Sequence, residues 1–255
     1  MSFRLVVAYL ALLGPLGASC GSDDSQGAAT GTGDITVFAA ASLTAAFTEI
    51  GDAFMVEYPD AKVTFNFAAS SELVSQIGEG APADVFASAD NGNMKKLTDA
   101  GNNATEPAIF AINLLEIIVG PGNPKGIAGV ADLANENLIV VICASEVPCG
   151  KYAAQIFESA GVAVTPKSLE ENVKAVVSKV TLGEADAGIV YRTDVAAAGD
   201  KAAGVEIPAD INVLAEYPIA VTKEASNAEG AQAFIDFVNC ELGQKILASY
   251  GFLAP

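Results

Sequence analysis

Four short segments place small or hydroxyl side chains where an apolar strand gives way to a helix. They read AAASL (39–43), FAASSEL (67–73), VPCGKY (147–152) and EENVKA (170–175). The first turn of a helix carries unpaired N–H groups and a partial positive charge, so it binds an anion without a cationic side chain. Small residues in the first three segments leave those N–H groups uncovered. The chemistry that these residues predict is anion binding by neutral donors.

Each of these residues also has a purely local explanation. Ser42, and Ser70 or Ser71, could simply cap the helices that follow them, which is worth about 1 kcal/mol per cap. Val173 is typical of a core residue, and Tyr191 at the end of AGIVY is typical of a tyrosine that bridges core and solvent. A common site is favoured because all four joins occupy the same position in a strand–helix unit, so they can face one cleft.

The elements that must position these joins alternate along the chain. Strands are predicted at 35–40, 63–67, 83–88, 114–120, 138–142, 187–191 and 216–222, and helices at 43–54, 73–77, 94–100, 151–159, 173–180 and 229–250. This alternation predicts an α/β protein with parallel strands covered by helices. The turn-rich sequence PGNPKG divides it into two units. Ligands of such sheets bind at the carboxyl ends of the strands, so we expect the site between two lobes.

The composition excludes several classes of function. Thirteen basic residues face 31 acidic ones, a formal charge of −18, which excludes binding of nucleic acid through phosphate neutralisation. Without histidine there is no Ser-His-Asp triad, no Cys-His pair and no histidine-ligated metal site. We expect a binding protein with no catalytic residue and no cofactor. The alternative of a secreted hydrolase with Ser42 as nucleophile lacks both a histidine and an S-x-x-K motif, since residue 45 is alanine.

The first twenty residues predict export from the cytoplasm. Arg4 precedes an apolar run at 5–13 that is shorter than the ~20 residues of a membrane span. The small-residue sequence LGPLGASC ends at Cys20 and predicts a lipoprotein: a signal peptide at 1–19 is removed and Cys20 is acylated. An ordinary secretory signal is the alternative. The polar residues 20–33 then form a flexible tether, and the protein works in the periplasm or on the outer face of the membrane.

Several segments resemble the substrate-binding proteins of molybdate ABC transporters. They are ITVFAAASLTAAFTEI, FNFAASSELVSQI, GAPADVFASAD, VPCGKYA and AGIVYRTD, and the similarity extends from about residue 35 to YGF at 250–252. It implies a type 2 periplasmic-binding-protein fold, with two mixed or parallel sheets flanked by helices and a ligand cleft between the lobes. Lobe I would comprise 34–115 and 219–255, and lobe II 116–218.

The resemblance also implies a ligand and the residues that bind it. Molybdate or tungstate would bind through its oxygens in the cleft, and a monomeric protein would deliver it to the permease subunits of an ABC transporter. The ligand-binding positions of the family correspond to Ser42, Ser70, Cys149, Val173 and Tyr191. The hydroxyl residues would donate O–H groups, and Cys149 and Val173 would donate backbone N–H groups. A binder of sulfate or phosphate on the same fold is the alternative.

Cys149 departs from the family, which usually has alanine at this position. Because Cys143 lies six positions earlier, we predict a disulfide across the loop in the oxidising space outside the membrane; two free buried thiols are the alternative. Closing so short a loop stabilises the fold by about 2 kcal/mol in the chain-entropy model and would hold the N–H of residue 149 in place. Cys240 is expected to be a small core residue on the last helix.

Overall fold

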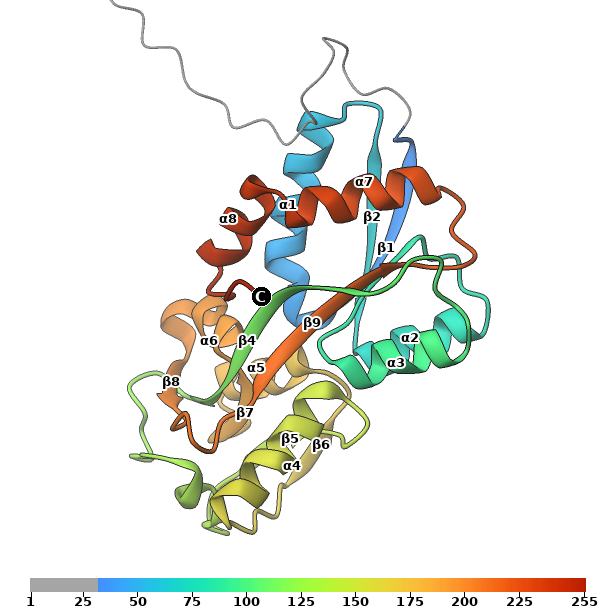
Figure 1. Ribbon diagram of the computed structural model, residues 1–255. Coiled ribbons are helices and arrows are strands. Elements are labelled where there is room, and N and C mark those ends of the chain that lie inside the picture. Colours follow the sequence, from blue (N-terminus) through green and yellow to red (C-terminus); the bar gives the residue numbers. More distant parts are fainter. Residues whose placement is uncertain (1–31) are drawn as a thin grey trace, which may run out of the picture.

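The structure is a computed structural model that describes residues 32–255, along which strands and helices alternate (Figure 1). The predicted signal peptide, Cys20 and nearly all of the tether lie outside the described residues. The strands are β1 (Asp34–Ala40), β2 (Lys62–Ala68), β3 (Val85–Ala87), β4 (Ala108–Val119), β5 (Val140–Cys143), β6 (Ser168–Glu170), β7 (Ala187–Tyr191), β8 (Ala203–Glu206) and β9 (Leu214–Val221). The helices are α1 (Thr44–Glu57), α2 (Ser70–Gly78), α3 (Asn91–Asp99), α4 (Pro148–Ala160), α5 (Val173–Thr181), α6 (Arg192–Ala198), α7 (Ala228–Asn239) and α8 (Glu241–Ser249). Short 3₁₀ turns lie at η1 (Ala41–Leu43), η2 (Val130–Ala134) and η3 (Gly199–Lys201).

The strands form a curled mixed sheet with the order β2-β1-β3-β9-β4-β7-β5-β6, and β8 pairs with β4. The strands β2, β1 and β3 run parallel in one half, and β6, β5 and β7 run parallel in the other. Between them, residues 108–114 of β4 pair antiparallel with β9, whereas residues 115–119 pair antiparallel with β7 and β8. The strand β4 therefore runs through both halves (Figure 1).

The predicted α/β alternation is confirmed, and the sheet is mixed, as the resemblance allowed; the expectation of only parallel strands from the alternation is wrong for β9, and for β4 where it pairs with β7. The strand β9 runs antiparallel between β3 and β4. The strands β8 and β9 follow one another along β4, both antiparallel to it, and no helix lies between them at 207–213. Three short elements, β6, α6 and β8, were not predicted because three to seven residues are too few to show a hydrophobic period.

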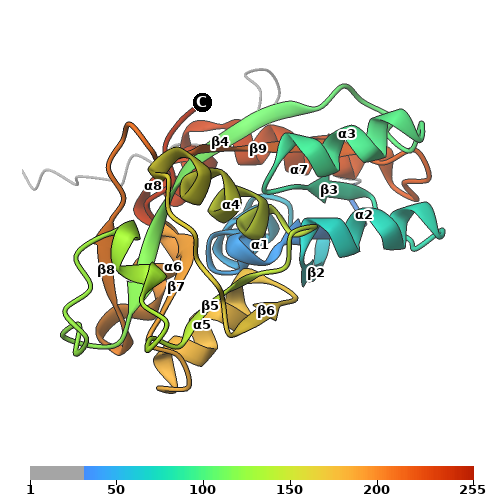
Figure 2. The ribbon, with the colours of Figure 1, turned by 90° about the horizontal axis from the view of Figure 1, so that it is seen from below.

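Helices cover both faces of the first half of the sheet. Side chains of β1 therefore point alternately to the two faces. Val37 and Ala39 belong to one apolar cluster, and Phe38 belongs to the other. The helices α1 and α7 pack on the first face, where Phe47 and Phe54 meet Phe234 edge to face. The helices α2 and α3 contribute to the second cluster and lie side by side (Figures 1 and 2). Among residues 32–255 no helix is both long and apolar enough to cross a bilayer.

The predicted single helix at 229–250 is instead two helices. Cys240 separates α7 from α8 in an extended conformation, with ψ near 169°. The second helix then packs tightly onto the first, since a Cβ added at Gly243 would lie 2.2 Å from the carbonyl oxygen of Phe237. Cys240 is half-buried at this break and not within a helix, so the expectation of a core residue on the last helix is wrong.

Candidate ligand-binding pocket

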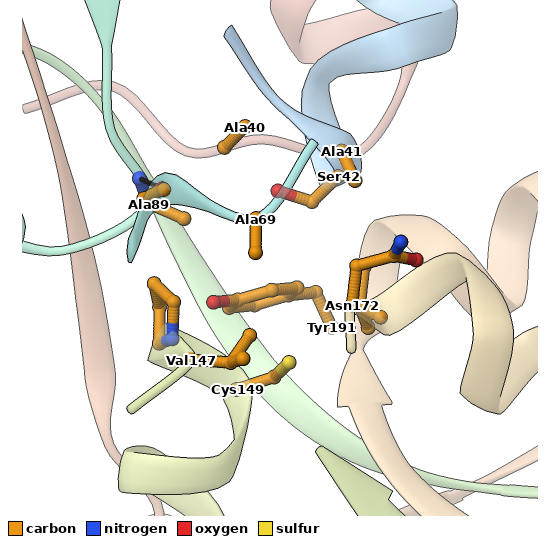
Figure 3. Close-up of a pocket in the computed structure, with 12 residues that line it drawn as sticks. Ala40, Ala41, Ser42, Ala69, Ala89, Val147, Cys149, Asn172 and Tyr191 are labelled. Atoms are coloured by element: carbon orange, nitrogen blue, oxygen red, sulfur yellow. Dashed lines mark hydrogen bonds between the residues drawn. The ribbon is translucent and has the colours of Figure 1, made fainter. Parts of the chain in front are cut away.

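A small pocket lies between the two halves of the sheet, where strands end and helices begin (Figure 3). The five residues predicted to bind a ligand all line it: Ser42, Ser70, Cys149, Val173 and Tyr191. Their neighbours in the same joins, together with Ala89 after β3, complete the wall with small or apolar side chains and one amide, Asn172, whose Oδ1 accepts from the N–H of Ala175. The structure thus brings together five residues that the sequence spreads over 150 positions.

Four helix starts supply the backbone of the pocket. Ser42 lies in the η1 turn that leads into α1, and Ser70 is the first residue of α2. Cys149 is the second residue of α4, after a proline that has no N–H, and Val173 is the first residue of α5. The N–H groups of a first helical turn have no partner within their helix. The pocket is therefore bordered by donors that no helix carbonyl can satisfy.

The two serines do not act as helix caps. Ala69 occupies the cap position of α2, Ala40 that of η1 and Leu43 that of α1, and none of them makes a side-chain cap bond. The backbone N–H of Ala89 instead donates to Ser70 Oγ at 3.0 Å. Because an N–H can only donate, Ser70 Oγ is the acceptor and keeps its own proton for a ligand.

The Tyr191 hydroxyl is buried and has no hydrogen-bond partner within the described structure. Its ring extends between Ser42 and Cys149 in Figure 3. Burial raises the pKa of Tyr191, and the nearby Tyr217 raises it further, so the phenol stays protonated at neutral pH. A buried polar group without a partner costs about 1–3 kcal/mol. A ligand oxygen in the pocket would remove that cost.

Ser42 has a partner that the sequence did not indicate. Its Oγ lies 2.9 Å from the hydroxyl oxygen of Tyr217, which is 175 positions away on β9. Both side chains are buried. In the sequence Tyr217 looks like an ordinary inward-facing strand residue, so only the pairing of β9 with β3 and β4 reveals the contact.

The start of α4 is held from two sides. Cys143 at the end of β5 and Cys149 form a disulfide with Cα atoms 5.8 Å apart, the pairing expected from the sequence. The next residue, Gly150, packs so closely that an added Cβ would lie 2.1 Å from the carbonyl oxygen of Ala144. The backbone N–H of Cys149 is thereby fixed against the loop that precedes it.

No charged side chain lines the pocket among the described residues. Arg192 lines a different cavity, where it lies 3.8 Å from Glu206. The nearby Lys151 and Lys174 are each bound by a carboxylate, at 2.6 Å from Asp90 and 2.7 Å from Asp194. Residues 32–255 also contain no group of three or more His, Cys, Asp or Glu side chains able to hold a metal ion. The arrangement can bind a ligand rich in acceptors.

Comparison with known proteins agrees with this geometry. The family model described as "Bacterial extracellular solute-binding protein" matches residues 35–253. The chain belongs to this family. The molybdate-binding protein ModA of Mycobacterium tuberculosis (strain ATCC 25618 / H37Rv) is 41% identical over 256 residues, which cover 100% of this chain and 98% of that protein.

Two solved solute-binding structures show the same fold. The periplasmic molybdate-binding protein of Azotobacter vinelandii gives a TM-score of 0.75 at 21% identity, covering 87% of this chain and 99% of that chain. The sulfate-binding protein SubI from Mycobacterium tuberculosis H37Rv gives 0.80 at 20% identity, covering 87% of both chains. The predicted type 2 periplasmic-binding-protein fold is confirmed. The fold by itself does not distinguish one oxyanion from another.

Replacing both Cys143 and Cys149 by alanine should loosen the start of α4. We expect the free energy of unfolding to fall by about 2 kcal/mol, because the unfolded chain regains the freedom of a short loop. Amide hydrogen exchange should become faster at residues 149–152 and stay unchanged in α2, which serves as the internal control. Unchanged exchange at 149–152 would show that Gly150 packing alone holds this turn.

Proposed function

We propose that this protein captures molybdate or tungstate outside the cytoplasmic membrane and passes it to the permease of an ABC transporter. The observation that carries the proposal is a pocket lined by hydroxyls and helix starts, in which the other polar side chain, Asn172, uses its Oδ1 to accept from the N–H of Ala175. Three hydroxyls and the first turns of four helices surround it, and no acidic or basic side chain does. The 41% identity to a protein named molybdate-binding supports the choice of ligand. The five lining residues Ser42, Ser70, Cys149, Val173 and Tyr191 are the proposed ligand-binding residues.

The protonation state of the ligand explains why donors alone suit it. Molybdate and tungstate are fully ionised at neutral pH, so each of their oxygens accepts hydrogen bonds and none donates. Hydrogen phosphate carries a proton that needs an acceptor, and leaving it unpaired in a dry pocket costs about 1–3 kcal/mol. Sulfate has the right protonation but is smaller, so its rejection depends on the distances between donors.

The acidity of the protein does not prevent an anion from binding. Removal of residues 1–19 takes away one basic residue, Arg4, so the mature charge is 12 − 31 = −19. The Debye length at physiological ionic strength is about 8 Å, which screens most of these surface charges from the pocket. Each hydrogen bond to a charged ligand contributes about 1.5–3 kcal/mol. Several such bonds outweigh the remaining repulsion.

We further propose that the two halves of the sheet act as lobes that close on the ligand. Lobe I (34–115 and 219–255) carries Ser42 and Ser70, and lobe II (116–218) carries the other three ligand-binding residues. The change of pairing partner along β4, after Leu114, supports this division. The strands β4 and β9 would then be the hinge.

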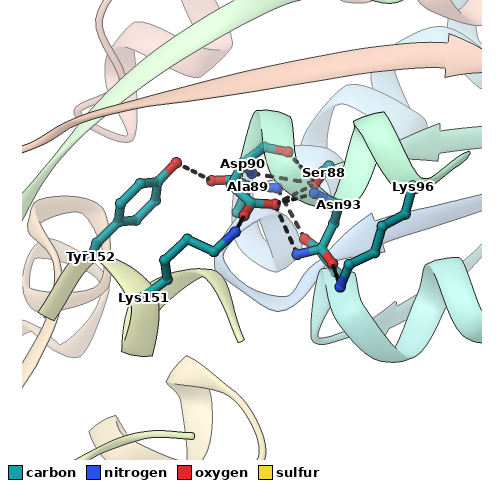
Figure 4. A network of polar contacts seen from close by, with 8 residues as sticks. Ser88, Ala89, Asp90, Asn93, Lys96, Lys151 and Tyr152 are labelled. Carbon is teal, nitrogen blue, oxygen red and sulfur yellow. Dashed lines mark hydrogen bonds and ion pairs between the residues drawn. The ribbon is translucent and has the colours of Figure 1, made fainter. Parts of the chain in front are cut away.

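Two polar contacts link these proposed lobes beside the pocket. Lys151 on α4 lies 2.6 Å from the buried carboxylate of Asp90, which follows β3. The neighbouring Tyr152 hydroxyl donates to the carbonyl oxygen of Ala89 at 3.3 Å (Figure 4). Ala89 in turn donates to Ser70. These contacts therefore link α4 of the proposed lobe II to Ser70 of lobe I, one of the proposed ligand-binding residues.

Export, anchoring and assembly are part of the same proposal. A lipid on Cys20 would hold the mature protein at the membrane, and residues 20–33 would let it reach the permease as a monomer. We propose no enzymatic activity, because Ser42 contacts a phenol and not a base that could activate it.

Isothermal titration of the mature protein with four oxyanions tests the function. Molybdate and tungstate should bind with similar affinity because they share charge and nearly share size. Hydrogen phosphate should bind at least about tenfold more weakly, for want of an acceptor. We expect the donors to be spaced for the longer bonds of molybdate, so sulfate, with its shorter bonds, should also bind more weakly. Binding of sulfate as tight as that of molybdate would overturn the choice of ligand.

Loss of a pocket hydroxyl should weaken binding more than it destabilises the fold. Tyr191→Phe should reduce molybdate affinity about 10- to 100-fold, the worth of one hydrogen bond to a charged partner. It should not lower the melting temperature of the ligand-free protein, since it removes an unsatisfied buried group. Ser42→Ala should weaken binding by a similar factor. The control is Tyr250→Phe, which removes a hydroxyl bonded to Glu49 outside the pocket. Equal affinities in all four proteins would reject the proposed ligand shell.

Lys151→Met should speed release of the ligand. The variant removes an ion pair between the proposed lobes, and we expect the dissociation rate to rise a few-fold, because Lys151 is 40% exposed and its pair is partly screened. Stopped-flow measurement of molybdate release checks this. Lys95→Met is the matched control, since Lys95 pairs with Asp99 within α3 at the same 2.6 Å. A rate no faster than that of the control would contradict the role of Lys151 in closure.

A further inference from the structure

We propose that the ion pair between Lys174 and Asp194 sets the net charge beside the pocket, and thereby how strongly the site prefers a dianion to a monoanion of the same shape. The inference rests on the proposed function, because it concerns the charge of the oxyanion that binds. Neither side chain lines the pocket, so both act on the ligand at a distance and not by contact.

Lys174 lies beside one of the ligand-binding joins. It is the second residue of α5 and directly follows Val173, which lines the pocket. The start of this helix is fixed, because Asn172 Oδ1 accepts from the backbone N–H of Ala175 at 3.0 Å. The Lys174 side chain is 35% exposed, so water screens part of its charge. A positive charge is therefore held close to the pocket without being part of its lining.

Asp194 lies beside the other join in the same half of the sheet. It is the third residue of α6, and its Oδ2 accepts from the backbone N–H of Tyr191 at 3.3 Å. The side chain is fully buried, and burial raises the pKa of the carboxyl while the ammonium of Lys174 opposes that rise. Burial is also the main cause of the raised pKa of the Tyr191 phenol, and the charge of Asp194 adds to it. The field of this carboxylate thus reaches a hydroxyl that lines the pocket.

The two charges offset each other because they are directly bonded. Lys174 Nζ donates to Asp194 Oδ1 at 2.7 Å. An unbalanced carboxylate here would repel a dianion about twice as strongly as a monoanion, and an unbalanced ammonium would attract it about twice as strongly, because the Coulomb energy is proportional to the ligand charge. With the pair intact, hydrogen bonds and not net charge decide which oxyanion binds.

Molybdate and perrhenate separate the effect of charge from that of shape, because both are tetrahedral oxyanions of similar size, a dianion and a monoanion respectively. Asp194→Asn keeps an acceptor for the N–H of Tyr191 and leaves the ammonium of Lys174 unbalanced. We expect molybdate affinity to rise about tenfold and perrhenate affinity about threefold in isothermal titration. The ratio of the two affinities should therefore rise about threefold. An unchanged ratio would overturn the proposal.

Two further variants complete the cycle. Lys174→Met leaves the carboxylate of Asp194 unbalanced, so the ratio of molybdate to perrhenate affinity should fall; this variant also tests the proposal if Asp194→Asn does not fold. Lys174→Met combined with Asp194→Asn removes both charges and should restore the wild-type ratio. Simple loosening of the pocket would weaken both ligands alike and leave the ratio unchanged. A double variant whose ratio stays as high as that of Asp194→Asn would contradict the role of Lys174.

Glu170→Gln is the matched control. Glu170 pairs with Lys179 on the same helix at the same 2.7 Å, and Lys179 is 34% exposed. Neither residue lines the pocket, and Lys179 lies about 9 Å along the helix from Val173. The ratio should therefore change less than in Asp194→Asn, and an equal rise would overturn the assignment to this pair. Absence of molybdate binding in the wild-type protein would instead reject the proposed function itself.

Discussion

A hydrogen-bond donor that is buried without an acceptor is costly, and this structure gathers such donors at one point. Each first helical turn at the pocket brings N–H groups that its own helix cannot satisfy. The Tyr191 hydroxyl adds a donor that no described group of the protein accepts. Native proteins rarely leave buried donors unpaired unless something outside the chain pairs with them. A ligand that supplies acceptors would recover the free energy that these unpaired donors cost.

A disulfide, tight glycine packing and long strands keep these donors in place. The disulfide and Gly150 fix the turn that carries Cys149. The strands β4 and β9 pass between the two halves, and β9 brings Tyr217 into contact with Ser42. These constraints would keep the direction of each donor unchanged during the proposed closure of the two lobes.

The sequence predicted the local part of this site and missed the part that depends on topology. A short window of sequence reveals the strand–helix joins that contain Ser42, Ser70 and Val173, and the family resemblance selected these residues within the joins. Tyr217 was missed because its contact with Ser42 arises only when β9 inserts antiparallel beside β3. The break at Cys240 was missed for a related reason: both helices have the same apolar period, and tight packing at Gly243, not composition, ends the first and begins the second.

The absence of cations from the pocket lining also has a physical explanation in this chain. A lysine ammonium attracts every anion. Neutral donors already disfavour a protonated oxyanion, so an ammonium is not needed for that selection. Lys151 and Lys174 sit next to the two joins on the second half of the sheet, but the buried carboxylates of Asp90 and Asp194 hold them. Removing either carboxylate would free a cation beside the pocket, whereas the pairs leave the local charge near zero. Recognition then depends on the number and direction of neutral donors, which is the property that separates a fully ionised oxyanion from one that keeps a proton.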